Sequence, residues 1–287
     1  MSLHILATGP QCTVQDAGRP GWFSDGVGAA GAADRRSYAL ANRLVGNDDG
    51  AAAFECLLGG LEFRADRPVT VAVTGAPAPI TVDDTPYGHA SVIDLAAGQV
   101  LRLGLAGAGL RTYVAVRGGL AVDAVLGSRS YDTLSGVGPA PVSVGDEVPI
   151  GPSPAGWPII AVAPVASMAT QPVTARITFG PRDDWFDNPA DLLAGWWEVS
   201  DRSDRVGARL IRPQRFPSLR RRDDAELPSE GIPLGAIQVP PSGEPVIFLP
   251  DHPITGGYPV VAVVADSDID AVAQARPGQH IKFIAAR

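Results

Sequence analysis

The sequence predicts a mostly β protein with a few short helices, and three observations favour this class. Glycine and proline are frequent, at 33 and 27 of the 287 residues, and they divide the chain into short segments. The apolar segments between them are rich in β-branched and aromatic residues. Hydrophobic residues make up 45% of the chain, which is enough for a packed core. We therefore expect strands that close into barrels or pack as sandwiches.

Eight short segments carry the strand pattern, and each has turn residues close by. In chain order they are residues 69–74, 100–103, 113–116, 176–179, 237–239, 246–249, 260–264 and 280–284. Three helices are predicted. The first follows Asp34, a good N-cap residue, and the others cover 189–197 and 267–274.

The division into domains is predicted from one segment. Residues 156–172 are rich in proline and alanine and contain no charged side chain. Such a stretch is typical of a connection between folded units. We expect a first β unit over 1–155, this connection, and a second β unit over 173–287, each of an ordinary domain size.

The run GVGAAG at residues 26–31 has the spacing of a dinucleotide-binding loop. That loop requires a buried strand before it, because the glycines must turn the chain from a parallel strand into a helix. Here Gly18, Pro20 and Gly21 interrupt the preceding segment, and a strand interior does not tolerate them. We interpret GVGAAG as a tight loop that leads into the helix after Asp34.

Charge and composition exclude several function classes. The net charge of −8 and the pI near 5.0 argue against general nucleic-acid binding, which needs a basic surface. The only lysine, Lys282, follows Ile281, so no P-loop Gly-Lys pair is present. The apolar stretch from Trp157 is broken by Pro164 and is too short to span a membrane.

The cysteines and the N-terminal segment indicate a location. Cys12 and Cys56 fit neither a zinc quartet nor a disulfide framework. The segment MSLHILATGPQ has no basic region followed by an apolar one, as a signal peptide would. We expect a cytoplasmic protein.

Self-contained catalytic motifs are absent from the sequence: there is no H-E-x-x-H, C-x-x-C or G-x-S-x-G. The richest loop is LPDHPITGGYP at 249–259, between two predicted strands, where a scaffold commonly presents binding groups. Its two glycines would let backbone N–H groups approach an anionic oxygen. The alternative is an ordinary hairpin connection whose polar side chains have no binding role.

Two arginine-rich segments could likewise have either a binding role or a structural role. VSDRSDRVGARL at 199–210 suits either carboxylate recognition or an internal cluster of salt bridges, and a structural role is favoured. Six arginines lie between Arg209 and Arg222. That run is typical of a solvated loop, although it would also suit an acidic partner.

Eight segments in order resemble one family, the biotin-dependent carboxyltransferase-like or allophanate hydrolase subunit 2 family, which includes the C-type subunit of bacterial ATP-dependent 5-oxoprolinase. They are TVQDAGRPGW at 13, GAADRRSYALANRLVGN at 31, AAAFECLLGG at 51, YVAVRGGLAVDAVLGSRS at 113, FGPRDDWF at 179, VSDRSDRVGARL at 199, GAIQVPPSGEPVIFLPD at 235 and TGGYPVVAVV at 255. The resemblance covers nearly the whole chain. It implies a fold of two cyclophilin-like β-barrel units.

The resemblance also implies an activity and partners. It implies a subunit of an ATP-dependent amidohydrolase that opens 5-oxoproline to glutamate and is active only as part of a complex. The expected partners are an allophanate hydrolase subunit 1-like chain, which is the B-type subunit of 5-oxoprolinase, and a lactam-binding protein like its A-type subunit. Two alternatives stay open: the carboxyltransferase part of a biotin-dependent urea-type carboxylase, and a non-catalytic regulatory subunit. ATP is expected for the complex, with its binding chain undetermined, and biotin only under the first alternative.

The predicted site joins the 249–259 loop to residues near the preceding hairpin. We expect Asp251, Tyr258 and Glu230 to be catalytic, because a carboxylate can orient or deprotonate water and a tyrosine can hold a carbonyl oxygen. The expected substrate-binding residues are Thr255, Gly256, Gly257, Gln238, Ser229 and Arg205. No metal site is expected.

Two departures from the family pattern bear on the site. Pro139-Ala140-Pro141-Val142 stands where relatives often have Gly-Arg-x-Leu, so an arginine contact to an anion is lost. Pro253-Ile254 precedes Thr255 where relatives often have Gln-Thr, so one hydroxyl of the loop is missing.

Overall fold

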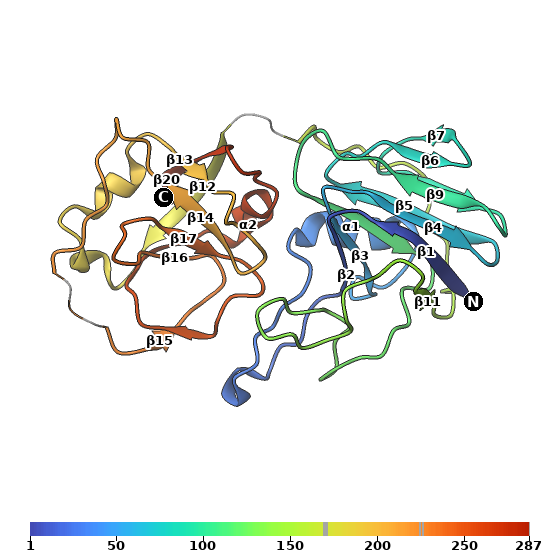
Figure 1. Ribbon diagram of the computed structural model, residues 1–287, viewed down its shortest axis with the longest axis horizontal. Coiled ribbons are helices and arrows are strands. Elements are labelled where there is room, and N and C mark those ends of the chain that lie inside the picture. The colour runs from blue at the N-terminus through green and yellow to red at the C-terminus, as the bar shows by residue number, and fades with distance from the viewer. Residues whose placement is uncertain (169–171, 224, 226, 287) are drawn as a thin grey trace. The chain divides into compact units, whose positions relative to one another are not determined.

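The computed structural model describes residues 1–168, 172–223, 225 and 227–286, which form two compact units (Figure 1). The N-terminal unit contains Met1–Arg19, Ala30–Asp132 and Gly136–Met168. The C-terminal unit contains Pro20–Ala29, Thr133–Ser135 and the described chain from 172 onward. The domain connection expected over 156–172 stays a prediction.

The N-terminal unit is built of two antiparallel sheets. One has the strand order β11-β1-β4-β9-β6-β7 and the other has the order β2-β3-β10-β5-β8. The strands are β1 (Ser2–Thr8), β2 (Gln11–Gln15), β3 (Ala53–Leu57), β4 (Leu61–Ala65), β5 (Val69–Gly75), β6 (Ile80–Val82), β7 (Thr85–Tyr87), β8 (Val92–Leu95), β9 (Val100–Leu103), β10 (Arg111–Val116) and β11 (Glu147–Pro149).

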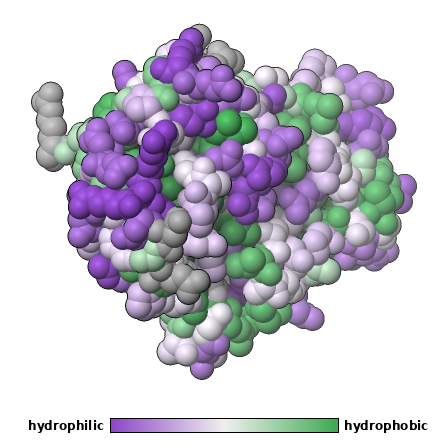
Figure 2. All heavy atoms as spheres, turned by 60° about the vertical axis from the view of Figure 1, so that its left-hand side comes forward, coloured by the Kyte–Doolittle hydropathy of each residue, from purple (hydrophilic) through white to green (hydrophobic). Residues whose placement is uncertain are grey.

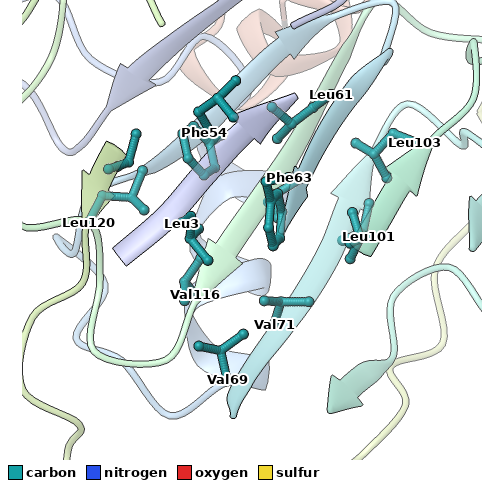
Figure 3. Close-up of a cluster of buried hydrophobic side chains, with 14 of the residues drawn as sticks. Leu3, Phe54, Leu61, Phe63, Val69, Val71, Leu101, Leu103, Val116 and Leu120 are labelled. Atoms are coloured by element: carbon teal, nitrogen blue, oxygen red, sulfur yellow. The ribbon is translucent and has the colours of Figure 1, made fainter. Parts of the chain in front are cut away.

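The core of this unit lies where apolar side chains of the two sheets meet. Phe63 on β4 and Phe54 on β3 stack with ring centroids 6.4 Å apart. Figure 3 shows leucine and valine side chains of both sheets gathered around them, among them Leu3 and Leu101. Burial of this apolar surface is the main contribution that stabilises the unit.

Strand β5, VTVAVTG, is buried along its whole length because both of its faces are covered. Val71 and Val73 point into the core between the sheets, whereas Ala72 belongs to a second cluster with side chains of α1 (Arg35–Leu44). The small alanine lets the helix approach closely. A continuous apolar run thus marks a strand covered on both faces.

Helix α1 begins at the predicted place. The Asp34 side chain accepts a hydrogen bond from the backbone N–H of Ser37 at 3.0 Å, as an N-cap residue does. The strand pairings given for this unit are antiparallel, so GVGAAG has no parallel β-α-β setting in the described residues. The loop interpretation of these glycines agrees with this topology.

The C-terminal unit contains a closed barrel with the strand order β12-β19-β16-β17-β14-β13-β20. Its elements are η1 (Phe23–Asp25), β12 (Val173–Phe179), η2 (Asp183–Trp185), η3 (Pro189–Leu193), β13 (Trp197–Val199), β14 (Gly207–Ile211), β15 (Glu230–Gly231), β16 (Ala236–Gln238), β17 (Val246–Phe248), β18 (Thr255–Gly256), β19 (Val260–Val264), α2 (Asp266–Ala273) and β20 (His280–Ala285). β12 pairs with β20 in parallel, and this pairing closes the barrel. The mostly β prediction is confirmed.

The helix predicted over 189–197 is wrong in part. Residues Pro189–Leu193 form only a short 3-10 turn, and the chain then enters strand β13 at Trp197. The indole of Trp197 is fully buried in the barrel and donates a hydrogen bond from Nε1 to the carbonyl oxygen of Leu192 at 3.0 Å. Barrel packing of Trp197 therefore overrides the local helical pattern.

Helix α2 packs on β12 and is tied to it by one ion pair. The Arg176 guanidinium donates from Nε and Nη2 to the two oxygens of Asp268, at 2.8 and 2.6 Å, and the Arg176 backbone N–H donates to the same carboxylate at 2.8 Å. These hydrogen bonds lower the pKa of Asp268 from its ordinary 3.8 to about 2. The carboxylate therefore stays charged down to strongly acidic pH.

We expect this pair to contribute stability that is lost in acid. Because the folded-state pKa lies below the ordinary value, the contribution is present above about pH 4 and disappears as the pH falls through about 2. Half of the Arg176 side chain is exposed, so solvent screening keeps the contribution small. Urea denaturation of the wild type and of Asp268→Asn at several pH values checks this. Equal pH dependence of both proteins in that window would contradict it.

No helix within the described ranges has the length and apolar character that crossing a membrane requires.

Candidate functional site

A two-stranded ribbon in the C-terminal unit brings several predicted site residues together. Strand β15 pairs antiparallel with β18, which places Glu230 opposite Gly256 and Gly231 opposite Thr255. The two strands are separated by more than 20 residues in the sequence, so the fold rather than sequence proximity unites them. Ser229 and Thr255, at the ribbon, are both exposed.

The ends of two side chains lie close to Gly256. A Cβ added there would lie 2.6 Å from Cδ1 of Ile232 and 2.8 Å from Nε2 of Gln238. A larger residue would push both away. The glycine thus lets the Gln238 amide lie directly against the ribbon.

Gln238 connects the barrel to the loop. It is the last residue of β16, it is nearly buried, and its Nε2 donates to the carbonyl oxygen of Tyr258 at 3.0 Å. This bond fixes the backbone at Tyr258, whose side chain is 46% exposed. Tyr258 is therefore open to solvent. Gly257 lies close to the backbone of Leu227. A Cβ added to Gly257 would be 3.2 Å from the Leu227 carbonyl oxygen.

Glu230 has a charged partner that sequence reasoning missed. Arg182 donates from Nε to one Glu230 oxygen at 3.2 Å and from Nη2 to the other. Hydrogen bonding from Arg182 lowers the pKa of Glu230, so the group is a carboxylate and a weak base at neutral pH. Arg182 lies in the segment FGPRDDWF, and its place in that segment was the signal that could have identified it.

Asp251 lies apart from solvent, with 0% of its surface exposed. Arg205 donates from Nε to Oδ2 at 2.9 Å and from Nη2 to Oδ1 at 3.0 Å, and only 4% of its side chain is exposed. The backbone N–H and the hydroxyl of Thr133 donate to Oδ2 at 2.9 and 2.7 Å. Four donors therefore hold both oxygens of this carboxylate.

The geometry separates two groups of predicted residues. Glu230, Gly256, Gln238 and Tyr258 are linked through the ribbon by the contacts above. Asp251 and Arg205 instead form a buried ion pair, which suits them to positioning the 249–259 loop rather than to proton transfer. Thr133 was missed because it is more than 100 residues away from Asp251 in the sequence.

A third missed residue is Arg19, in the segment TVQDAGRPGW of the N-terminal unit. Only 2% of it is exposed, and its Nη2 donates to the carbonyl oxygen of Ser130. Its Nε and Nη1 are buried and have no hydrogen-bond acceptor among the described residues. No sequence pattern distinguishes this arginine from the solvated ones.

The ribbon offers hydroxyl, carboxylate and backbone groups, which are the means to bind and polarise an amide or a carboxylate. Within the described chain, no three His, Cys, Asp or Glu side chains are placed to share a metal ion. The chemistry that these residues can perform is hydrogen bonding, charge stabilisation and general base assistance.

Comparison with known proteins covers both units of the chain. Residues 25–285 match the family model "Carboxyltransferase domain, subdomain A and B". The chain is 36% identical to the 5-oxoprolinase C-type subunit of Escherichia coli (strain K12), over 98% of this chain and 90% of that one. The solved urea amidolyase of K. lactis is similar over all of this chain, with a TM-score of 0.90 and 28% identity.

The share of the relatives that the chain covers differs widely. It spans 19% of the K. lactis urea amidolyase chain. It spans 55% of the solved protein TTHA0988, to which it is 33% identical with a TM-score of 0.87. Because the family model covers more than nine tenths of the sequence, the chain belongs to the family of the carboxyltransferase domain, subdomains A and B.

Proposed function

We propose that this chain is one subunit of an ATP-dependent amidohydrolase that opens 5-oxoproline to glutamate. The observation that carries the proposal is the end-to-end similarity to the C-type subunit of a 5-oxoprolinase, which covers 98% of this chain and 90% of the relative. The similarity covers both units of this chain, and the proposal therefore carries the role named for that relative over to it.

Reaction chemistry supports the need for partners. A lactam is a poor electrophile, so its hydrolysis by water is coupled to ATP cleavage, which normally uses a dedicated nucleotide site. The ribbon does not suit a triphosphate, because the arginine that contacts it, Arg182, is already paired with Glu230. We therefore assign ATP use to the complex, together with a B-type (allophanate hydrolase subunit 1-like) chain and a lactam-binding A-type protein.

Within the complex, the ribbon residues receive distinct roles. We assign Tyr258, Thr255 and the N–H groups of Gly256 and Gly257 to binding the carbonyl or carboxylate oxygens of the substrate. Glu230 would orient water as a carboxylate, with Arg182 holding its position. The buried Asp251 and Arg205 would hold the loop that carries Tyr258.

A second candidate function is the carboxyltransferase part of a biotin-dependent urea-type carboxylase. It is favoured by the family description and by the TM-score of 0.90 to the K. lactis urea amidolyase. This chain spans 19% of that enzyme, so the activity of the whole enzyme would need further domains or chains. Biotin would enter only under this candidate.

Reconstitution tests the proposal. We expect no 5-oxoproline hydrolysis by this chain alone, a stable complex with the B-type chain, and ATP-dependent release of glutamate only when the A-type protein is also present. The readouts are glutamate formation and co-elution on size exclusion. A full set that forms but does not turn over 5-oxoproline would reject the proposal, and biotin-dependent carboxylation of urea would then favour the second candidate.

The same assay tests the ribbon. Tyr258→Phe removes one exposed hydroxyl and should lower turnover about tenfold or more if the hydroxyl binds the reacting oxygen. Tyr87→Phe, an exposed tyrosine on β7 of the other unit, is the matched control and should leave turnover unchanged. Full activity of Tyr258→Phe would remove this residue from the proposed site.

A further inference from the structure

A recess of about 500 Å³ opens on the C-terminal unit, between the end of β14, residues 218–221 and the turn at 241–244. Its lining includes the arginines Arg212, Arg220 and Arg221 and the hydroxyls of Ser218 and Ser242. The volume falls within the range of small-molecule sites. Figure 2 turns this unit forward and shows hydrophilic residues gathered over much of its near face.

The walls of the recess are fixed, although the sequence favours a solvated loop there. Leu219 is buried, and Gly243 at the opposite turn lies so close that an added Cβ would be 3.0 Å from the Leu219 carbonyl oxygen. The Arg220 carbonyl oxygen accepts from the Asp187 N–H at 3.1 Å, and the Arg222 N–H donates to the Trp185 carbonyl oxygen at 2.9 Å. The arginines therefore project from a backbone that is held on both sides.

Arg212 is a fixed positive charge of the wall. Its Nε, Nη1 and Nη2 donate to the carbonyl oxygens of Pro217, Trp196 and Asp191 at 2.8, 3.3 and 2.9 Å. Its guanidinium lies over the Trp197 ring, 4.1 Å from the centroid. Carbonyls and an aromatic face hold this cation in place, and Asp191 is a negative charge that acts on it from outside the recess lining.

The other two arginines keep donors available. Arg220 is exposed and uses its Nε toward the Ser218 hydroxyl at 3.3 Å, and no described group accepts from its Nη atoms. Arg221 donates from Nη2 to the Ala225 carbonyl oxygen, and its buried Nε has no acceptor among the described residues.

The recess lining carries more positive than negative side chains. The single acidic residue of the lining, Glu244, is paired with Arg202, whose Nη2 lies 2.9 Å from Oε2. Three arginines thus line the recess, and the one carboxylate in its described lining is paired, in a chain whose net charge is −8. A compact, multiply charged oxyanion matches this arrangement, because guanidinium and hydroxyl groups are both donors to phosphate oxygens.

We propose that this recess binds a phosphate-bearing small molecule. Arg220 and Arg221 donate to the phosphate oxygens, the Ser218 and Ser242 hydroxyls add neutral donors, and Arg212 supplies fixed positive potential. The site is separate from the ribbon residues assigned to the substrate, and its test does not depend on turnover of 5-oxoproline.

Calorimetric titration of the purified chain with pyrophosphate, with ATP and with citrate tests the proposal. Pyrophosphate should bind, and Arg220→Gln and Arg221→Gln should each weaken it about tenfold or more, because each removes a charge-assisted hydrogen bond. Arg209→Gln is the matched control, since Arg209 is exposed on the neighbouring β14 and does not line the recess. Ser242→Ala, which leaves the arginines and the loop backbone in place, should weaken binding several-fold.

Comparing the affinities for ATP and pyrophosphate shows whether the site recognises a nucleotide or the phosphate groups alone. ATP that binds more tightly than pyrophosphate identifies a nucleotide as the ligand, and equal affinities identify the phosphates alone; both support the proposal. It is overturned if pyrophosphate and ATP do not bind, if citrate binds as tightly as pyrophosphate, or if folded Arg220→Gln and Ser242→Ala bind like the wild type. Far-UV circular dichroism establishes that each variant is folded.

Discussion

Replacing Asp251 by alanine should lower the free energy of unfolding by about 3–5 kcal/mol. The substitution removes the carboxylate that accepts two hydrogen bonds from Arg205, a side chain that is only 4% exposed. It also removes the acceptor of the Thr133 N–H and hydroxyl. The cost arises because a buried guanidinium loses its counter-charge, not because the pair itself is strongly favourable.

Urea denaturation followed by circular dichroism measures this loss. Asp201→Ala is the matched control, because Asp201 is exposed in the connection between β13 and β14 that carries Arg205, and it accepts one long bond, 3.3 Å from the Ser200 hydroxyl. It should change the free energy of unfolding by less than about 0.5 kcal/mol. If Asp251→Ala is as stable as Asp201→Ala, the ion pair does not hold the loop, and a direct catalytic role of Asp251 becomes the better explanation of its presence.

The second large effect is expected in the N-terminal unit, at Glu55. Its Oε2 accepts from the Tyr113 hydroxyl at 2.7 Å and from the Ala33 N–H at 2.9 Å, and its Oε1 lies 3.4 Å from Nε of Arg111. Burial, followed by the charge of Glu55, raises the pKa of Tyr113, so the phenol remains a donor. We expect Glu55→Ala to lower the free energy of unfolding by about 3–5 kcal/mol, because three buried donors lose this acceptor.

A strand of the other sheet provides the control for Glu55. Glu62 on β4 also faces an arginine, with Arg102 Nε 3.1 Å from its Oε1, but both side chains are partly exposed. Glu62→Ala should cost no more than about 1 kcal/mol in the same denaturation experiment. Equal losses for the two variants would show that burial does not determine the strength of these pairs.

Local patterns in the sequence were sufficient for most elements of the fold. Alternation or continuous apolar runs located β5, β9 and β19, and the Asp34 N-cap located α1, because these signals depend on neighbouring residues. The pattern failed at Trp197, where the requirement to fill the barrel interior decides the conformation. The pairing of β12 with β20 could not be foreseen, since nothing local specifies which strands meet.

The sequence was sufficient to locate the loop of the candidate site, but not the hydrogen-bond and ion-pair partners of its residues. The sequence of residues 249–259 and the family resemblance pointed to Asp251 and Tyr258 together, yet the structure gives one a buried partner and leaves the other exposed. What decides between them is Arg205 and Thr133, which approach Asp251 from distant parts of the chain. Electrostatic partners of this kind are properties of the fold and cannot be inferred from spacing.

The parallel pairing of β12 with β20 has a consequence for how the barrel forms. Val173 is paired with Ile281 and Ile177 with Ala285, so the contact that completes the cylinder joins segments about a hundred residues apart. Such non-local pairing makes folding slow, because a long loop must be ordered before the closing bonds form. During synthesis on the ribosome, a nascent chain that has emerged only as far as α2 still exposes the open edges of β12 and β13. Unpaired strand edges are prone to aggregate, so this interval is when the unit is most exposed to misassembly.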